Sequence, residues 1–222
     1  LTQRARAALE ESQVIAGYTT YVDLVRKDFP EKELLVSGMR GEVQRCRAAL
    51  ERAASGATVA LVCSGDPGVY GMAGLVLELA QDMVLADVVE VEVVAGVTAA
   101  TGGAALLGAP LMHDFCLVSL SDLLTPWDAI EARLRAAARA GFVICLYNPC
   151  SHGRPDHLAH AAQILLEELP ASCVCGIAHN VGRPGEGARV LTLGELADAP
   201  ADMTSIVYVG NATTREIAGR MV

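Results

Sequence analysis

The strongest constraint on the fold is an apolar run that ends in a glycine-rich turn. Residues 59–63 read Val-Ala-Leu-Val-Cys, and residues 64–71 then read Ser-Gly-Asp-Pro-Gly-Val-Tyr-Gly. A short apolar run before a turn is typical of a buried parallel strand. Glycine lets a ligand approach the backbone, proline stiffens the turn, and ligands of open α/β sheets bind beyond the carboxyl ends of strands. The pattern therefore predicts a small-molecule site at the tip of this strand.

The rest of the chain alternates strand-like and helix-like segments, which predicts an α/β fold. The first half has the βαβ order of a mostly parallel sheet, and the closely spaced late strands predict a mixed second sheet. Gly108-Ala109-Pro110 interrupts the pattern, so we expect two α/β domains, residues 1–108 and 109–222. The predicted strands are 14–17, 34–36, 59–63, 88–94, 115–120, 142–147, 173–179, 188–192 and 205–209; the predicted helices are 2–12, 41–54, 71–81, 97–107, 125–140 and 154–169.

Composition narrows the class of function. The chain carries a formal net charge of −9, whereas a general nucleic-acid binder normally has a basic excess. No apolar run reaches the roughly 18 residues that span a membrane. The seven cysteines include no Cys-x-x-Cys pair and fit free thiols in a reducing cytosol. We therefore expect a cytoplasmic protein without nucleic-acid or membrane partners.

A metal site is a weaker interpretation. Cys150, His152, His157, His160 and Cys173 fall within a short span, but zinc sites usually show tighter paired spacing. His157 and His160 are three residues apart on a predicted helix and could share a face. Ordinary histidines explain the pattern better, so we predict no metal.

Two loops resemble those of a known family, the tetrapyrrole methylases. Residues 64–71 resemble its S-adenosylmethionine loop, and residues 94–99, Val-Ala-Gly-Val-Thr-Ala, resemble its second loop with Ala95 in place of the usual proline. The start of the chain resembles the end of the first family motif without its glycine-rich part, so we expect more than ten further residues before Leu1. The resemblance covers essentially the whole chain. It implies two α/β domains with the cofactor cleft between them.

Further segments resemble one branch of the family. They are residues 37–39, 113–115, 119–127, 146–149 and 209–211. This branch methylates C-17 of precorrin-3B, or of cobalt-factor III, and contracts the ring during cobalamin biosynthesis. The resemblance implies S-adenosylmethionine as cofactor, S-adenosylhomocysteine as product, a tetrapyrrole substrate and a homodimer. The open alternatives are a methylase acting on another carbon, a relative that methylates a protein residue, and a tetrapyrrole-binding relative without turnover.

The resemblance also implies which residues bind the cofactor. Asp66 has a second interpretation as a residue that caps its own turn, and Thr98 as an N-cap of the next helix. Neither role excludes cofactor binding. The implied cofactor-binding residues are Ser64, Gly65, Asp66, Val69, Thr98, Ala99, Asn148 and Val181, with Thr204 and Ser205 nearby.

Ring contraction requires proton transfer, both from the C-20 hydroxyl and to a lactone, so a general acid or base is expected. His113 and Asp114 follow the predicted domain boundary, and we predict that they are catalytic. The alternative for His113 is a turn cap or a bond to a buried carbonyl. Ser119, Asp122 and Thr125 are weaker candidates, and Asp122 could equally be a solvated loop residue.

The many carboxylates of a precorrin require local arginines on this acidic chain, because arginine binds carboxylates with two parallel hydrogen bonds. We therefore expect a basic cleft on an acidic body. Arg45 could instead lie on a solvated helix face, and Arg154 could serve a helix start. The predicted substrate-binding residues are Met39, Arg40, Arg45, Ser119 and Arg154, with Arg183 as a further candidate.

Overall fold

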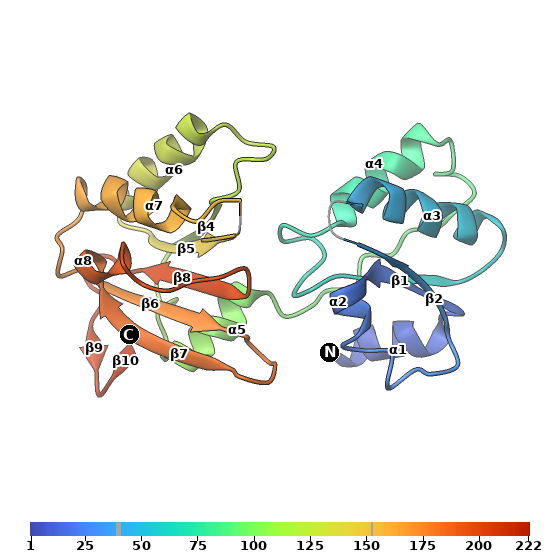
Figure 1. The fold of residues 1–222 in the computed structure, drawn as a ribbon, viewed down its shortest axis with the longest axis horizontal. Coiled ribbons are helices and arrows are strands. Elements are labelled where there is room, and N and C mark those ends of the chain that lie inside the picture. The colour runs from blue at the N-terminus through green and yellow to red at the C-terminus, as the bar shows by residue number, and fades with distance from the viewer. Residues whose placement is uncertain (39–40, 152) are drawn as a thin grey trace. The chain divides into compact units, whose positions relative to one another are not determined.

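The computed structural model describes residues 1–38, 41–151 and 153–222, which form two compact units. Unit 1 is Leu1–Thr98 and unit 2 is Ala99–Val222 (Figure 1). The division lies ten residues before the predicted boundary at Gly108. Helix α5 (Ala99–Leu107) accounts for the difference, because its buried face packs against the sheet of unit 2.

Unit 1 has a three-stranded parallel sheet, one strand fewer than the first half of the sequence predicted. Its strands are β1 (Val14–Tyr18), β2 (Glu33–Ser37) and β3 (Val59–Val62), in the order β2-β1-β3. Both neighbours run parallel to the central strand β1.

Helices cover both faces of this sheet (Figure 1). Helices α1 (Gln3–Glu11) and α2 (Thr19–Val22) lie on one face, and α3 (Glu42–Ala54) and α4 (Ala73–Asp82) lie on the other. Strand β3 and the residue after it contribute to the hydrophobic clusters on both faces. Ala60 and Val62 pack against the cluster under α1 and α2, named the α1–α2 cluster, whereas Leu61 and Cys63 pack against the cluster under α3 and α4, named the α3–α4 cluster. This alternation follows from the two-residue period of a strand.

Unit 2 has a five-stranded mixed sheet, which confirms the predicted fold class. Its order is β4-β5-β8-β6-β7; β4 and β5 are parallel, and the other neighbours are antiparallel. The strands are β4 (Phe115–Ser119), β5 (Val143–Tyr147), β6 (Val174–His179), β7 (Gly187–Thr192) and β8 (Ser205–Val209). A short hairpin of β9 (Glu216–Ile217) and β10 (Arg220–Met221) was not predicted.

Two hydrophobic clusters sandwich this second sheet. The larger cluster lies under α6 (Trp127–Arg139), α7 (His157–Leu166) and α8 (Leu193–Leu196), and the smaller one lies under α5. Neighbouring residues of β5 face opposite clusters, since Ile144 belongs to the larger and Cys145 to the smaller.

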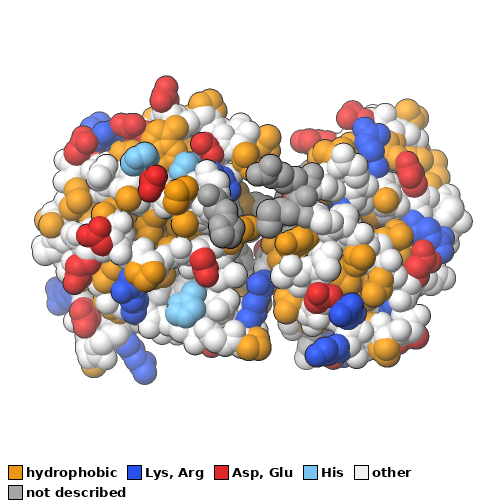
Figure 2. Space-filling model, in the orientation of Figure 1, with side chains coloured by type: hydrophobic (Ala, Val, Ile, Leu, Met, Phe, Trp, Pro, Cys, Tyr) orange, Lys and Arg blue, Asp and Glu red, His pale blue; other side chains and the backbone are white. Residues whose placement is uncertain are grey.

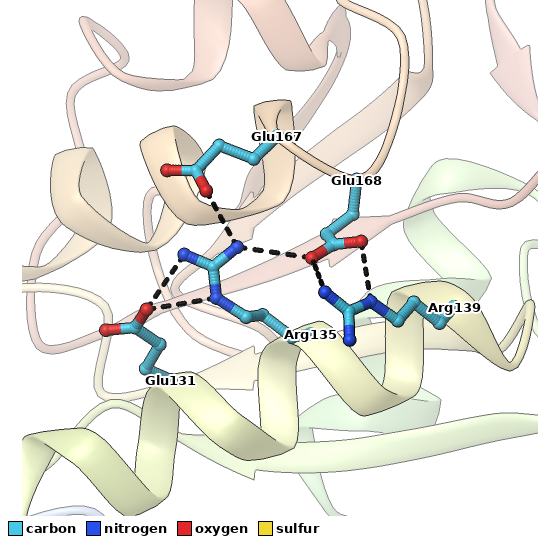
Figure 3. Close-up of polar contacts among 5 residues, drawn as sticks. All are labelled: Glu131, Arg135, Arg139, Glu167 and Glu168. Atoms are coloured by element: carbon cyan, nitrogen blue, oxygen red, sulfur yellow. Dashed lines mark hydrogen bonds and ion pairs between the residues drawn. The ribbon is translucent and has the colours of Figure 1, made fainter.

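An ionic network joins α6 to the end of α7 (Figure 3). Arg135 contacts Glu131 at 2.8 Å, Glu167 at 2.9 Å and Glu168 at 3.2 Å, and Arg139 contacts Glu168 at 2.6 Å. The hydrogen bonds from Arg139 and Arg135 outweigh burial and hold the pKa of Glu168 below its usual range.

The predicted strand 88–94 is wrong. Val89 and Val91 pack against the α3–α4 cluster, while Glu90 and Glu92 are exposed. The segment forms no strand. The alternating pattern therefore reports one partly buried face of this segment, which does not require pairing in a sheet.

On the side that Figure 2 shows, Lys and Arg side chains lie interspersed with Asp and Glu, and no large patch carries charge of one sign alone. Within the described ranges, no helix has both the length and the apolarity to cross a membrane.

Candidate functional site

The glycine-rich loop that follows β3 is held in shape by Asp66. Its Oδ1 accepts the Gly68 N–H at 2.8 Å, which confirms that Asp66 caps its own turn. Its Oδ2 accepts the Gly96 N–H at 2.9 Å, so the same carboxylate also holds the second predicted loop. Gly65 has φ +73°, a conformation that favours glycine. One carboxylate thus joins the two loops that resemble cofactor loops.

Sequence reasoning missed the role of Gly96, which brings the two backbones together. A Cβ on Gly96 would lie 1.9 Å from the Gly65 carbonyl oxygen, so no side chain fits there. The available signal was the glycine that remains in residues 94–99 although the usual proline is replaced. Beside this contact, the backbone of Gly65 is exposed, as are the apolar side chains of Tyr70 and Val97. A ligand could reach both polar backbone and apolar side chains.

In unit 2, strand directions bring most of the other predicted residues to one sheet edge. Strands β4, β5 and β6 run in the same direction and β7 and β8 run opposite, so three carboxyl ends and two amino ends meet there. Asn148 Nδ2 donates to Ser119 Oγ at 2.9 Å, and the Asn180 N–H donates to the Thr204 carbonyl at 3.2 Å. The residues that share this edge, named here the carboxyl edge, are Ser119, Asn148, Val181, Thr204 and Ser205.

Backbone conformation and capping fix this edge. Asn148 has φ +53° and Asn180 has φ +50°, in the left-handed region that few side chains adopt. The Thr204 and Ser205 hydroxyls donate to Asp202 Oδ1 at 2.7 and 2.9 Å. Burial opposes the effect, but these hydrogen bonds hold the pKa of Asp202 below its usual range. The hydrogens of both hydroxyls are therefore engaged within the loop.

The start of α5 is anchored to the same sheet by two tyrosines. Tyr147 Oη accepts the Ala100 N–H at 2.9 Å, and Tyr208 Oη donates to the carbonyl oxygens of Ala99 and Ala100. Burial raises the pKa of Tyr208, which is consistent with a neutral hydroxyl donor. Ala99 thus has a fixed position in unit 2, and Thr98, the last residue of unit 1, is half-buried.

His113 and Asp114 do not lie at the carboxyl edge. They precede β4, and the Asp114 carbonyl accepts the Val143 N–H at the amino end of β5. At about 3.3 Å per strand residue, His113 is about 20 Å from Ser119 along β4. His113 instead lines a surface hollow with Met112, Asn211, Arg215 and others. Strand β4 therefore separates His113 from Ser119, and the catalytic role of His113 and Asp114 stays a prediction.

The predicted substrate-binding arginines are largely engaged within the protein. Met39 and Arg40 lie outside the described residues. Arg45 is only 5% exposed, which rules out a solvated helix face; its guanidinium donates to Ser37 Oγ at 2.8 Å and to the Gly38 carbonyl at 2.9 Å. Met72 Sδ lies 3.3 Å from Nη1. Arg45 therefore braces the segment that leads into residues 39–40.

Arg154 also has an internal role. Its Nη1 donates to Ser121 Oγ at 2.5 Å and its Nε to Ser151 Oγ at 3.2 Å. These bonds tie the loop after β4 to the loop after β5, which agrees with the structural alternative.

The described residues contain no group of three or more His, Cys, Asp or Glu side chains suited to a metal ion. His152 lies outside them. The seven cysteines are free thiols. Burial raises the pKa of Cys46 to about 11 and that of Cys145 to about 12, so these thiols are poor nucleophiles near neutral pH.

The fold and the paired loops define a class. Residues 1–197 match the family model described as Tetrapyrrole (Corrin/Porphyrin) Methylases, and the chain belongs to this family of methyltransferases. It is 49% identical over 222 residues to the "Probable cobalt-factor III C(17)-methyltransferase" of Salmonella typhimurium, covering all of this chain and 91% of that protein. It is 44% identical to the "Precorrin-3B C(17)-methyltransferase" of Sinorhizobium sp, over 97% of this chain and 85% of that protein.

Solved structures agree. The methyltransferase CobJ superposes with a TM-score of 0.91 at 38% identity, covering 100% of this chain and 92% of CobJ. A uroporphyrin-III C-methyltransferase from Thermus thermophilus, solved with S-adenosylhomocysteine, superposes with a TM-score of 0.69 at 23% identity, covering 95% and 90% of the two chains. This second likeness concerns the fold alone.

Proposed function

We propose that the protein transfers a methyl group from S-adenosylmethionine to C-17 of precorrin-3B, or of cobalt-factor III, and contracts the macrocycle in cobalamin biosynthesis. The observation that carries the proposal is the pair of loops joined by Asp66 and Gly96. The 49% and 44% identical relatives named for this reaction support the choice of substrate.

The residues at the two loops fit S-adenosylmethionine. Exposed backbone at Ser64 and Gly65 offers hydrogen bonds to the polar parts of the cofactor, and Val69 and Val97 offer apolar contact. We propose that Thr98, Ala99, Asn148, Val181, Thr204 and Ser205 also contact it. When bound, S-adenosylmethionine supplies a methyl group on a positively charged sulfur, which is a good leaving group. The protein then needs mainly to orient the partners and exclude water.

The substrate-binding proposal changes because Arg45 and Arg154 make hydrogen bonds within the protein. Arg45 acts by bracing the segment before Met39 and Arg40, and these two residues keep their proposed contact with substrate carboxylates. Ser119 keeps its place because it lies at the carboxyl edge beside Asn148. Arg154 acts by holding the loops after β4 and β5 together.

We further propose a homodimer in the cytoplasm. Free cysteines suit a reducing compartment, and dimerisation is what the family resemblance implies. Light scattering of the purified full-length protein would detect twice the chain mass if this is right, and a single chain mass at micromolar concentration would contradict it.

The test of the function uses S-adenosylmethionine labelled with an isotope in its methyl group. The protein is incubated with either macrocycle, and mass spectrometry follows the label. We expect one labelled methyl group per macrocycle. Binding of the cofactor without methylation of either macrocycle would move the assignment to another methylase, and absence of cofactor binding would contradict it entirely.

A further inference from the structure

Three charged or titratable side chains meet near the carboxyl edge of unit 2. The proposed function gives them no shared role. Asp122 lies in the loop after β4, Arg154 in the loop after β5, and His157 is the first residue of α7. We name them the Asp122 cluster. Their loops begin next to Ser119 and Asn148, the two residues joined by a hydrogen bond at that edge.

The carboxylate of the cluster is its exposed member. The side chain of Asp122 is 40% exposed, whereas those of Arg154 and His157 are 19% and 16% exposed. Asp122 Oδ1 lies 3.8 Å from Arg154 Nη1, and Oδ2 lies 3.3 Å from His157 Nε2. Two cationic or basic side chains therefore stand behind one carboxylate that a ligand can reach.

His157 Nε2 is the unusual atom. Among the side chains that the structure describes, it is the one buried nitrogen or oxygen without a hydrogen-bond partner. The groups recorded against the ring are the Asp122 carboxylate and the Trp127 ring of α6, whose centroid lies 4.9 Å away in an edge-to-face arrangement; Arg154 contacts the other oxygen of Asp122. His160 of the same helix also contacts Trp127, with 6.0 Å between the two ring centroids. Of these, only the Asp122 carboxylate can exchange a proton with Nε2.

A buried nitrogen without a hydrogen-bond partner requires an explanation. One explanation is that Nε2 receives a proton only during turnover. Next to Asp122, Leu123 is 73% exposed and Leu124 is 98% exposed. Adjacent leucines this exposed offer an apolar surface to a ligand. A carboxylate beside them suits a macrocycle that carries a hydroxyl on an apolar ring.

We propose that Asp122 and His157 form a proton relay for the ring contraction, with Arg154 positioning Asp122. The inference rests on the proposed function. The O–H bond of the substrate hydroxyl breaks with its electron pair left on oxygen, and the proton binds Asp122 and moves to His157 Nε2. The pair releases the proton to water before the next turnover. The imidazole is the natural end of the relay because imidazoles accept protons near neutral pH.

The test compares Asp122→Asn and His157→Gln with two matched controls. Asp156→Asn removes a carboxylate from an exposed neighbour of His157, and His160→Gln removes the other imidazole beside Trp127. Each variant is assayed for S-adenosylmethionine binding, methyl transfer and contraction as separate readouts. We expect contraction to fall at least about 100-fold in the two relay variants and far more than methyl transfer does, so that methylated, uncontracted macrocycle accumulates. The controls should contract normally.

The pH profile supplies a second readout, which a structural role would not move. The pH profile of contraction by His157→Gln should differ from that of the native enzyme, because only the native enzyme carries the imidazole. Normal contraction in either relay variant would overturn the proposal, as would an equal loss of cofactor binding, methyl transfer and contraction. If the native enzyme binds the cofactor but methylates neither macrocycle, the proposed function itself fails.

Discussion

At the residue scale, the account depends most on a glycine that has no room for a side chain. Gly96 touches the Gly65 backbone, and its N–H is held by Asp66. Gly96→Ala must push the two loops apart. We expect the affinity for S-adenosylmethionine to fall at least about tenfold, or ~1.4 kcal/mol, as measured by calorimetric titration.

The matched control for this change is Gly74→Ala in α4. Apart from the adjoining residues and the backbone of its own helix, no heavy atom lies within 4 Å of the added Cβ, and alanine favours a helix over glycine by up to about 1 kcal/mol. This variant should bind the cofactor normally and unfold at slightly higher denaturant concentration. Normal cofactor binding by Gly96→Ala would contradict the contact between the loops.

Arg45 provides a test of internal bracing. Arg45→Lys keeps the charge but cannot bond to Ser37 and Gly38 at once with the same geometry. We expect the free energy of unfolding to fall by about 1–3 kcal/mol. Arg47→Lys, on the exposed face of the same helix, should change it little. Equal stabilities in chemical denaturation would show that Arg45 braces nothing.

Sequence reasoning placed single residues well where strand direction decides their position. The rule about carboxyl ends located the loop at Ser64, and the family resemblance named Asn148, which follows β5 directly. Sequence reasoning did not show that His113 and Ser119 lie at opposite ends of β4. Burial of Arg45 was also hidden, since its place on the inner face of α3 depends on contacts with Met72 from a distant segment.

At the scale of elements, the ionic network between α6 and α7 makes stability depend on pH. The folded-state pKa of Glu168 is lowered chiefly by its hydrogen bonds to Arg139. A carboxylate with a lowered pKa stabilises the fold at any pH above its pKa in the unfolded chain. This stabilisation is lost as the pH falls through its pKa in the folded protein. Glu168→Gln should therefore lower the melting temperature at pH 7, and the difference should vanish in acid.

Dissolved salt should also screen the charges of the network, because the Arg139 side chain is 67% exposed. Added salt should shrink the melting difference between the native protein and Glu168→Gln. Asp198→Asn, at another exposed position of unit 2, serves as the control and should show no such dependence on pH. A difference that persists unchanged at low pH would argue that packing, and not charge, explains it.

Elements with a strong local pattern were predictable, and those that depend on partners were not. The apolar run of β3 and the turn after it specify strand and loop locally. Residues 88–94 show a two-residue period without pairing, because one buried face produces the same pattern as a strand. Helix α5 was assigned to the first domain because sequence order cannot show that it packs on the sheet of unit 2.

At the scale of the whole molecule, the two units carry different parts of the proposed chemistry. Unit 1 supplies the paired loops, and unit 2 supplies the carboxyl edge and the Asp122 cluster. Neither set contains an activated nucleophile, which agrees with methyl transfer from a cofactor that already carries its leaving group.

The most direct measurement is the structure of the product that the full-length protein makes from S-adenosylmethionine and precorrin-3B or cobalt-factor III. Carbon-13 NMR with a labelled methyl group would locate the methylated carbon, and the absorbance spectrum would report the size of the ring. The account predicts a methyl group at C-17 of a contracted macrocycle. A methyl group on another carbon of an uncontracted ring would contradict it.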